Sequence, residues 1–241
     1  MGVMKVLWLF AHPDPRSLNA ALRDEGLRAL TEAGHEYRLS DLYAMKWDPL
    51  VCEVGAFDED VVAEQEKLRW ADAFVVQFPM WWYGMPAIMK GWFDRVFVRG
   101  FGYGVKAEDG TVLRYGEGTL TGKRALVITT VGGRHSGLGP RGVNGDISSL
   151  LFPLQHGTFW YAGMAALPPV VIYGADRVEF RAAATEVRSR VAALPSATPI
   201  RYRYQNAGDY DENLVLRPDL APGRTGLEIH QVVERSATRR R

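Results

Sequence analysis

Apolar runs and segments with helical periodicity alternate along most of the chain. Five short runs predict strands, and the near-continuous apolar ones are typical of parallel strands buried on both faces. They are Lys5–Ala11, Glu36–Ser40, Ala73–Phe78, Arg124–Thr130 and Pro169–Tyr173. The longer segments predict helices at Leu18–Glu32, Asp58–Arg69, Pro86–Val96, Asn144–Ala162 and Val178–Ala193. The alternation predicts an α/β fold with a doubly wound, five-stranded parallel sheet.

Several residues mark where the predicted helices begin, end or bend. Ser17 or Asn19 offers an N-cap for the first helix, and Asp58 caps the second. Pro86 stands in a first turn, where its missing N–H does no harm. Pro153 must kink or divide the helix that contains it.

Residues 195–241 differ from the rest of the chain. They are rich in Pro, Gly, Asn and Asp, and they have no periodicity. We expect an extended, irregular C-terminal arm that packs on the domain or on a partner subunit and ends in a frayed tail. Residues 1–194 then form the ligand-binding domain, and 195–241 belong to the same unit.

Composition narrows the functional classes. With 47% apolar residues and a net charge of +1, the chain resembles an ordinary globular enzyme and predicts no nucleic-acid partner. The single cysteine, Cys52, excludes an internal disulfide and is best interpreted as a buried, inert thiol. The apolar run at the N-terminus is too short for a signal peptide or a membrane span. We therefore expect a cytoplasmic protein without membrane insertion.

The first candidate loop is His12–Asn19, after the first strand. It opens a helix, so unpaired backbone N–H groups and the positive end of the helix dipole face it. His12, Arg16 and Ser17 add polar groups suited to phosphate oxygens. We favour a diphosphate site, and the alternative is a turn that proline residues make rigid.

The second loop is Pro79–Tyr83, after the third strand. It places Trp81, Trp82 and Tyr83 in a row, although exposing such rings forfeits the burial that each could obtain. A flat, three-ring cofactor would cover them. The alternative is an apolar dimer patch, and both interpretations hold if a cofactor lies at a dimer interface.

The third loop, Thr129–Asp146, is rich in glycine, which lets the backbone approach a ligand closely. Because this loop follows the fourth strand, we expect it to lie at the same edge of the sheet as the other two loops.

Other motifs are absent. No G-x-G-x-x-G joins a strand to a helix, and Gly116–Lys123 lacks P-loop spacing and is followed by Arg124. Ser136 has no nucleophile-elbow pattern around it. The histidines show no metal-ligand spacing, so no metal site is predicted.

A series of segments resembles the flavin-dependent NAD(P)H:quinone oxidoreductases of the DT-diaphorase type. The segments cover most of residues 4–175 and include AHPDPRSLNAAL, SDLYAMKWDP, QFPMWWYGMPAIMKGWFDRVF, GFGY, TTVGG, NGDISSLLFPLQHG and WYAGM. The resemblance implies a flavodoxin-like fold and a homodimer with FAD, less readily FMN, at two interface sites. NAD(P)H would be the co-substrate, and a quinone or a similar electrophile would accept the electrons.

The resemblance also implies residue roles. The cofactor contacts would be His12, Ser17, Leu18, Asn19, Pro79, Met80, Trp81, Trp82, Tyr83, Thr129, Thr130, Gly132 and Gly133. The catalytic positions would be Asn144, Tyr103, Gly132 and Gly133. The substrate pocket would be lined by Trp82, Tyr83, Tyr103, His135 and Tyr161, with Tyr103 and Tyr161 presented by the partner subunit.

Two departures from the family pattern affect the chemistry. Asn144 stands where mammalian relatives carry a histidine, and an amide can donate a hydrogen bond but carries no proton at neutral pH. Near the place of the relatives' loop tyrosine stand only His135, Ser136 and Gly137. The alternative function is a non-catalytic flavoprotein, either an electron carrier or a regulatory subunit of a membrane transporter.

Overall fold

The computed structural model describes residues 2–51 and 58–232. Cys52 and the end of the predicted tail lie outside the described residues. None of the helices in these two ranges is both long and apolar enough to cross a membrane.

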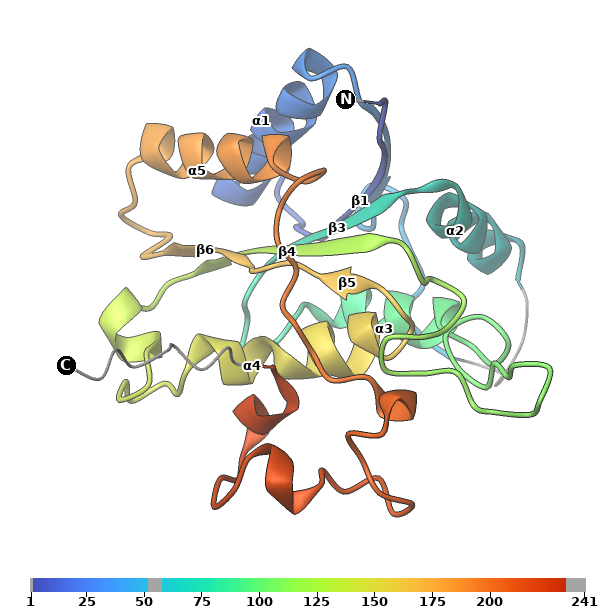
Figure 1. Cartoon of the computed structure of the whole chain (residues 1–241). Helices are drawn as coiled ribbons and strands as arrows, with labels where there is room; N and C mark the ends of the chain where they lie inside the picture. Colours follow the sequence, from blue (N-terminus) through green and yellow to red (C-terminus); the bar gives the residue numbers. More distant parts are fainter. Residues whose placement is uncertain (1, 52–57, 233–241) are drawn as a thin grey trace.

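A parallel sheet forms the centre of the molecule (Figure 1). Its strands are β1 (Lys5–Phe10), β2 (Glu36–Asp41), β3 (Ala73–Pro79), β4 (Arg124–Val131), β5 (Ala165–Ala166) and β6 (Val170–Tyr173). The order is β2-β1-β3-β4-β5, and β6 also pairs with β4. β5 lies opposite Arg124 and β6 opposite Ile128, so both occupy one edge position. The predicted five-position, flavodoxin-like sheet is confirmed, but its last strand is interrupted at Leu167–Pro169.

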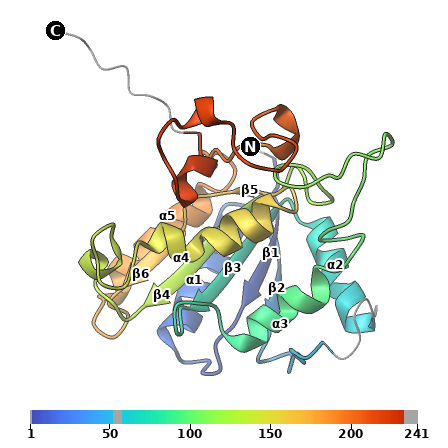
Figure 2. The same cartoon turned by 90° about the horizontal axis from the view of Figure 1, so that it is seen from below.

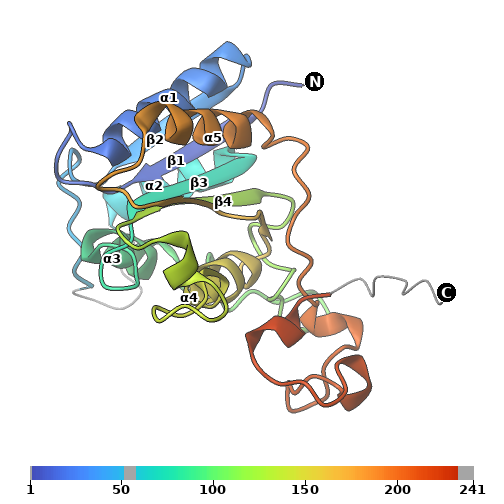
Figure 3. The ribbon, with the colours of Figure 1, turned by 90° about the vertical axis from the view of Figure 1, so that its left-hand side faces the viewer.

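Helices cover both faces of the sheet (Figure 3). α1 (Leu18–Glu32) and α5 (Phe180–Ala192) lie on one face, and α2 (Glu59–Trp70), α3 (Ala87–Val96) and α4 (Ile147–Leu154) lie on the other. Each face buries its own apolar cluster against the strands. Burying strand side chains on both faces is what the near-continuous apolar runs require.

The helix predicted at 144–162 is divided, as Pro153 indicated. α4 begins three residues later than predicted because Asp146 caps it, accepting a hydrogen bond from the Ser148 N–H (2.8 Å). After Pro153 the chain continues as a π-helix, η2 (Gln155–Trp160). Asn144 therefore lies in the loop before α4 and not in a helix.

The side-chain caps predicted for the first two helices differ in outcome. Ser17 caps α1, accepting a hydrogen bond from the Ala20 N–H (3.2 Å). Asp58 occupies the N-cap position of α2, but its side chain makes no capping hydrogen bond. The prediction of a side-chain cap there is wrong because the Asp58 carboxylate instead pairs with Arg95 (2.8 Å).

The arm that follows α5 folds back on itself instead of running extended. It contains the short 3-10 turns η3 (Gln205–Ala207), η4 (Pro218–Leu220) and η5 (Leu227–His230). Arg203 joins its parts, donating to the Ile229 carbonyl (3.0 Å) and pairing with Asp209 (3.0 Å). Figure 2 shows the arm beside the end of the helix formed by α4 and η2, away from the loops that follow β1, β3 and β4.

Candidate functional site

Three loops meet beyond the carboxyl ends of β1, β3 and β4. The His12 ring lies beside the Trp81 ring, with centroids 6.0 Å apart. The Tyr83 hydroxyl donates to Oδ1 of Asn144 at 3.0 Å. The first loop thus contacts the second, and the second contacts the third. The ligand crevice of open α/β sheets lies at this same edge.

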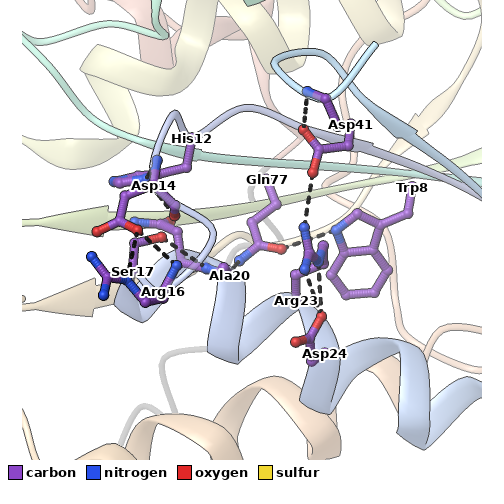
Figure 4. A network of polar contacts seen from close by, with 12 residues as sticks. Trp8, His12, Asp14, Arg16, Ser17, Ala20, Arg23, Asp24, Asp41 and Gln77 are labelled. Atoms are coloured by element: carbon purple, nitrogen blue, oxygen red, sulfur yellow. Dashed lines mark hydrogen bonds and ion pairs between the residues drawn. The ribbon is translucent and has the colours of Figure 1, made fainter.

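A buried chain of hydrogen bonds supports the loops from below, and part of it is visible in Figure 4. Trp8 Nε1 donates to Gln77 Oε1 (2.9 Å), and Gln77 Nε2 donates to the Asn19 carbonyl (2.7 Å). Asn19 Nδ2 donates in turn to Thr130 Oγ1 (2.9 Å). Deleting one member would leave a buried polar group unpaired. The network therefore fixes β1, α1, β3 and β4 relative to one another.

Sequence reasoning missed Trp8 and Gln77. A glutamine inside an otherwise apolar strand was the available signal, because a buried polar side chain needs partners. Four predicted cofactor contacts, Asn19, Pro79, Thr129 and Thr130, are buried. These four residues lie at the buried base of the loops, and the other predicted cofactor contacts are more exposed.

The first loop leaves donors unused at the start of α1. The His12 Nδ1 atom lies within hydrogen-bond distance of both the Asp14 N–H (3.0 Å) and the Asp14 carbonyl oxygen (3.2 Å), which holds the ring against the start of the loop. Within the described ranges, the backbone N–H groups of Leu18 and Asn19 have no hydrogen-bond partner. Together with the helix dipole and the exposed Arg16, they suit an anion such as a phosphate.

The second loop is a tight, strained turn, which we call the Trp82 turn (Trp81–Gly84). Trp81 and Gly84 exchange two backbone hydrogen bonds, of 2.9 and 3.1 Å. The central residues, Trp82 and Tyr83, have φ values of 47° and 66°, a region that bulky residues rarely adopt. Such strain costs about 1–3 kcal/mol per residue and is found mainly at functional sites. The Trp82 side chain is 96% exposed, so the turn displays a ring instead of burying it.

The third loop places an amide against glycines. The backbone N–H of Asn144 donates to the Gly137 carbonyl (3.0 Å). Its Nδ2 atom lies 3.5 Å from where a Cβ on Gly133 would stand and 3.2 Å from one on Gly137. A side chain at position 137 would crowd this amide, whereas one at position 133 would meet it at an ordinary contact distance.

His135 lies apart from the Trp82 turn. Its ring contacts the Tyr173 ring edge-on at 4.8 Å. Burial, followed by the charge of Asp146, raises the pKa of Tyr173. In the described part of the chain, no hydrogen bond or ring contact joins His135 to Trp82 or Tyr83.

Tyr103 and Tyr161 lie together, but at a different cavity. They line a hollow of about 490 Å³ with Met85 and Lys90. Tyr83 lines a neighbouring cavity of about 280 Å³ that shares Met85 and Lys90. Within one chain, the two tyrosines therefore line a cavity next to that of Tyr83, and Trp82 lines neither of these two cavities.

The residues present fit a ligand with a flat ring system and a phosphate tail. An exposed indole offers a stacking surface, and unpaired N–H groups at a helix start offer an anion site. Residues 4–194 match the family model described as "Flavodoxin-like fold". Curated relatives of similar length confirm the family.

The chain is 43% identical to the ribosyldihydronicotinamide dehydrogenase-like protein traD of Penicillium crustosum, over 96% of this chain and 97% of that one. It is 35% identical to NAD(P)H dehydrogenase [quinone] 1 of Cavia porcellus, over 72% of this chain and 70% of that one. The chain belongs to the flavodoxin-like NAD(P)H:quinone oxidoreductase family. The predicted family is thereby confirmed.

Solved structures of this quinone oxidoreductase family agree. A putative quinone reductase from Klebsiella pneumoniae superposes with a TM-score of 0.90 at 46% identity, over 95% of this chain and 100% of that one. An NAD(P)H:quinone oxidoreductase from Methanothermobacter marburgensis gives a TM-score of 0.69 at 25% identity, over 82% of this chain and 100% of that one.

Proposed function

We propose that the protein is an FAD-dependent NAD(P)H:quinone oxidoreductase that works as a homodimer. The observation that carries the proposal is the Trp82 turn, which holds an almost fully exposed indole in a strained backbone and whose Trp81 ring contacts His12 in the loop that opens α1. The relatives named NAD(P)H dehydrogenase [quinone] supply the substrate class. FAD is the flavin that the sequence resemblance implies.

The residues of the three loops would divide the work. Trp82 would stack on the ring system, and the start of α1, with His12 and Arg16, would bind the diphosphate. When bound, the flavin supplies the redox chemistry, accepting hydride from the dihydronicotinamide and passing two electrons to the quinone. The Trp82 turn and the glycine-rich loop would hold the two substrates, one after the other, against the same face of the ring system. Binding in this way would supply proximity and orientation.

A homodimer accounts for the position of Tyr103 and Tyr161. Within one chain they line a cavity next to the one that Tyr83 lines. The family resemblance implies that a second copy would bring its own tyrosines over the Trp82 ring. Sedimentation at micromolar concentration tests it, and a monomer that nonetheless reduces quinone would contradict it.

The experiment that tests the proposed function begins with the purified chain. Extraction and mass measurement of the bound cofactor identify the flavin. Addition of NADH, NADPH or a ribosyl dihydronicotinamide, followed by a soluble quinone, should bleach the flavin and then restore its colour. A colourless protein that fails to quench added FAD would overturn the proposal, and colour without bleaching would favour a non-catalytic flavoprotein.

A further inference from the structure

Tyr83 and Asn144 form a pair that spans two of the loops. The Tyr83 hydroxyl donates to Oδ1 of Asn144, and the Asn144 backbone is held separately by the Gly137 carbonyl. A side-chain amide has one accepting and one donating end. Because Tyr83 occupies the accepting end, the donating end must face the glycine loop.

The donating end of Asn144 forms no hydrogen bond with the described part of the chain. Its Nδ2 atom lies over Gly133 and Gly137, where side chains would otherwise stand. Within residues 2–51 and 58–232, no acceptor receives its two N–H groups. The amide is therefore fixed in orientation by the chain and still has two unused donors at the site edge.

We propose that Tyr83 is a positioning residue that locks the Asn144 amide so that its NH₂ group donates to an oxygen of the ligand beside Trp82. The proposal rests on the proposed function, which places a flat redox ligand there. A donor fixed in advance stabilises negative charge that develops on oxygen, without reorganising at the moment of reaction. A phenylalanine at position 83 would keep the ring but leave the amide free to turn over.

The first test needs no flavin. In ¹⁵N-labelled protein, the side-chain amide signals of Asn144 are assigned by their loss in Asn144→Ala. We expect their ¹⁵N relaxation to match the rigid backbone in the wild type and to report a mobile side chain in Tyr83→Phe. Tyr37→Phe, the same chemical change at an exposed strand position, should leave the signals unchanged. Equal rigidity in Tyr83→Phe and the wild type would overturn the proposal.

The second test is a double-mutant cycle on the flavin-loaded enzyme. Tyr83→Phe should lower kcat about tenfold, which is equivalent to about 1.4 kcal/mol. The dissociation constant of FAD should change by less than about twofold. In the Asn144→Ala background, Tyr83→Phe should have no further effect, because the group it positions is gone. Additive losses would overturn the proposal. A wild type that binds no flavin would instead refute the proposed function, and the amide relaxation would still decide the role of Tyr83.

Discussion

Two groups of aromatic side chains show opposite uses of the same residue types. Near the arm, His156 is sandwiched between Phe152 and Tyr115, with ring centroids 4.4 and 4.9 Å away, and Tyr202 meets its edge at 4.9 Å. The Trp82 turn instead leaves its central indole 96% exposed. The chain closes the first group with its own arm and leaves the second open. Burial in the first therefore stabilises the fold, whereas the second is available for binding.

The largest expected effect comes from the closed group. Tyr202 is 4% exposed and packs against Trp160 as well as His156. Tyr202→Ala should lower the free energy of unfolding by about 3–5 kcal/mol, as for other large rings removed from a core. Urea denaturation measures this, with the exposed Tyr37→Ala as the control at about 0.5 kcal/mol or less. Equal losses at both positions would remove the contrast between buried and exposed rings.

The closed group should also make stability depend on pH. Burial, and then the nearby His230, lowers the pKa of His156 from 6.5 to about 4. Between pH 6.5 and 4, His156 is protonated in the unfolded chain but stays neutral in the folded chain. The free energy of unfolding should therefore fall as the pH drops toward 4. The loss through His156 is about 3 kcal/mol, and it levels off below that pH.

Denaturation curves at several pH values check this expectation. His156→Phe should remove most of the loss. A remainder of the same sign should persist, because burial and the charge of Arg203 also lower the pKa of His230. A variant with the same pH dependence as the wild type would show that His156 titrates normally.

In the open group, Trp82→Ala should separate binding from folding. The free energy of unfolding should change by less than about 0.5 kcal/mol, since the ring buries almost nothing in the chain. The dissociation constant of FAD should rise about 10- to 100-fold, as expected for the loss of a stacking ring. Fluorescence quenching measures it, with Phe180→Ala as a matched exposed ring. Unchanged FAD affinity would show that Trp82 does not contact the cofactor.

The smallest expected effect is that of Asn144→Ala. Removing one fixed donor should lower kcat about tenfold while FAD affinity changes less than about threefold. Steady-state kinetics and flavin titration on the same preparation measure both quantities. Equal losses in turnover and affinity would mean that Asn144 holds the loop instead of serving the reaction.

The sequence predicted the strands and helices that carry strong periodicity. The β1, β3 and β4 strands match their predicted runs to within one residue, because buried parallel strands leave long apolar signals. β5 was missed, since two alanines carry no pattern. The folded arm was missed because contacts such as Arg203 with the Ile229 carbonyl have no local signature.

The sequence was enough to predict which three loops form the candidate site. It was not enough to predict the contacts between them or the backbone conformation of the Trp82 turn. The place of each loop after a strand followed from topology alone. The bond between Tyr83 and Asn144 joins residues 61 positions apart, and propensity argues against a left-handed turn at Trp82. The Asp58 cap failed for a similar reason, since its partner, Arg95, comes from another helix.

The interrupted edge of the sheet limits how copies of this chain can meet. Pro168 and Pro169 separate β5 from β6, and the opposite edge, β2, presents the exposed Glu36 and Arg38. Prolines and charges at sheet edges discourage another strand from pairing there. Pairing of a second copy's strand with either edge of the sheet is therefore disfavoured. This protects the protein from aggregation through its sheet edges. Any stable contact between copies is left to the helices and loops.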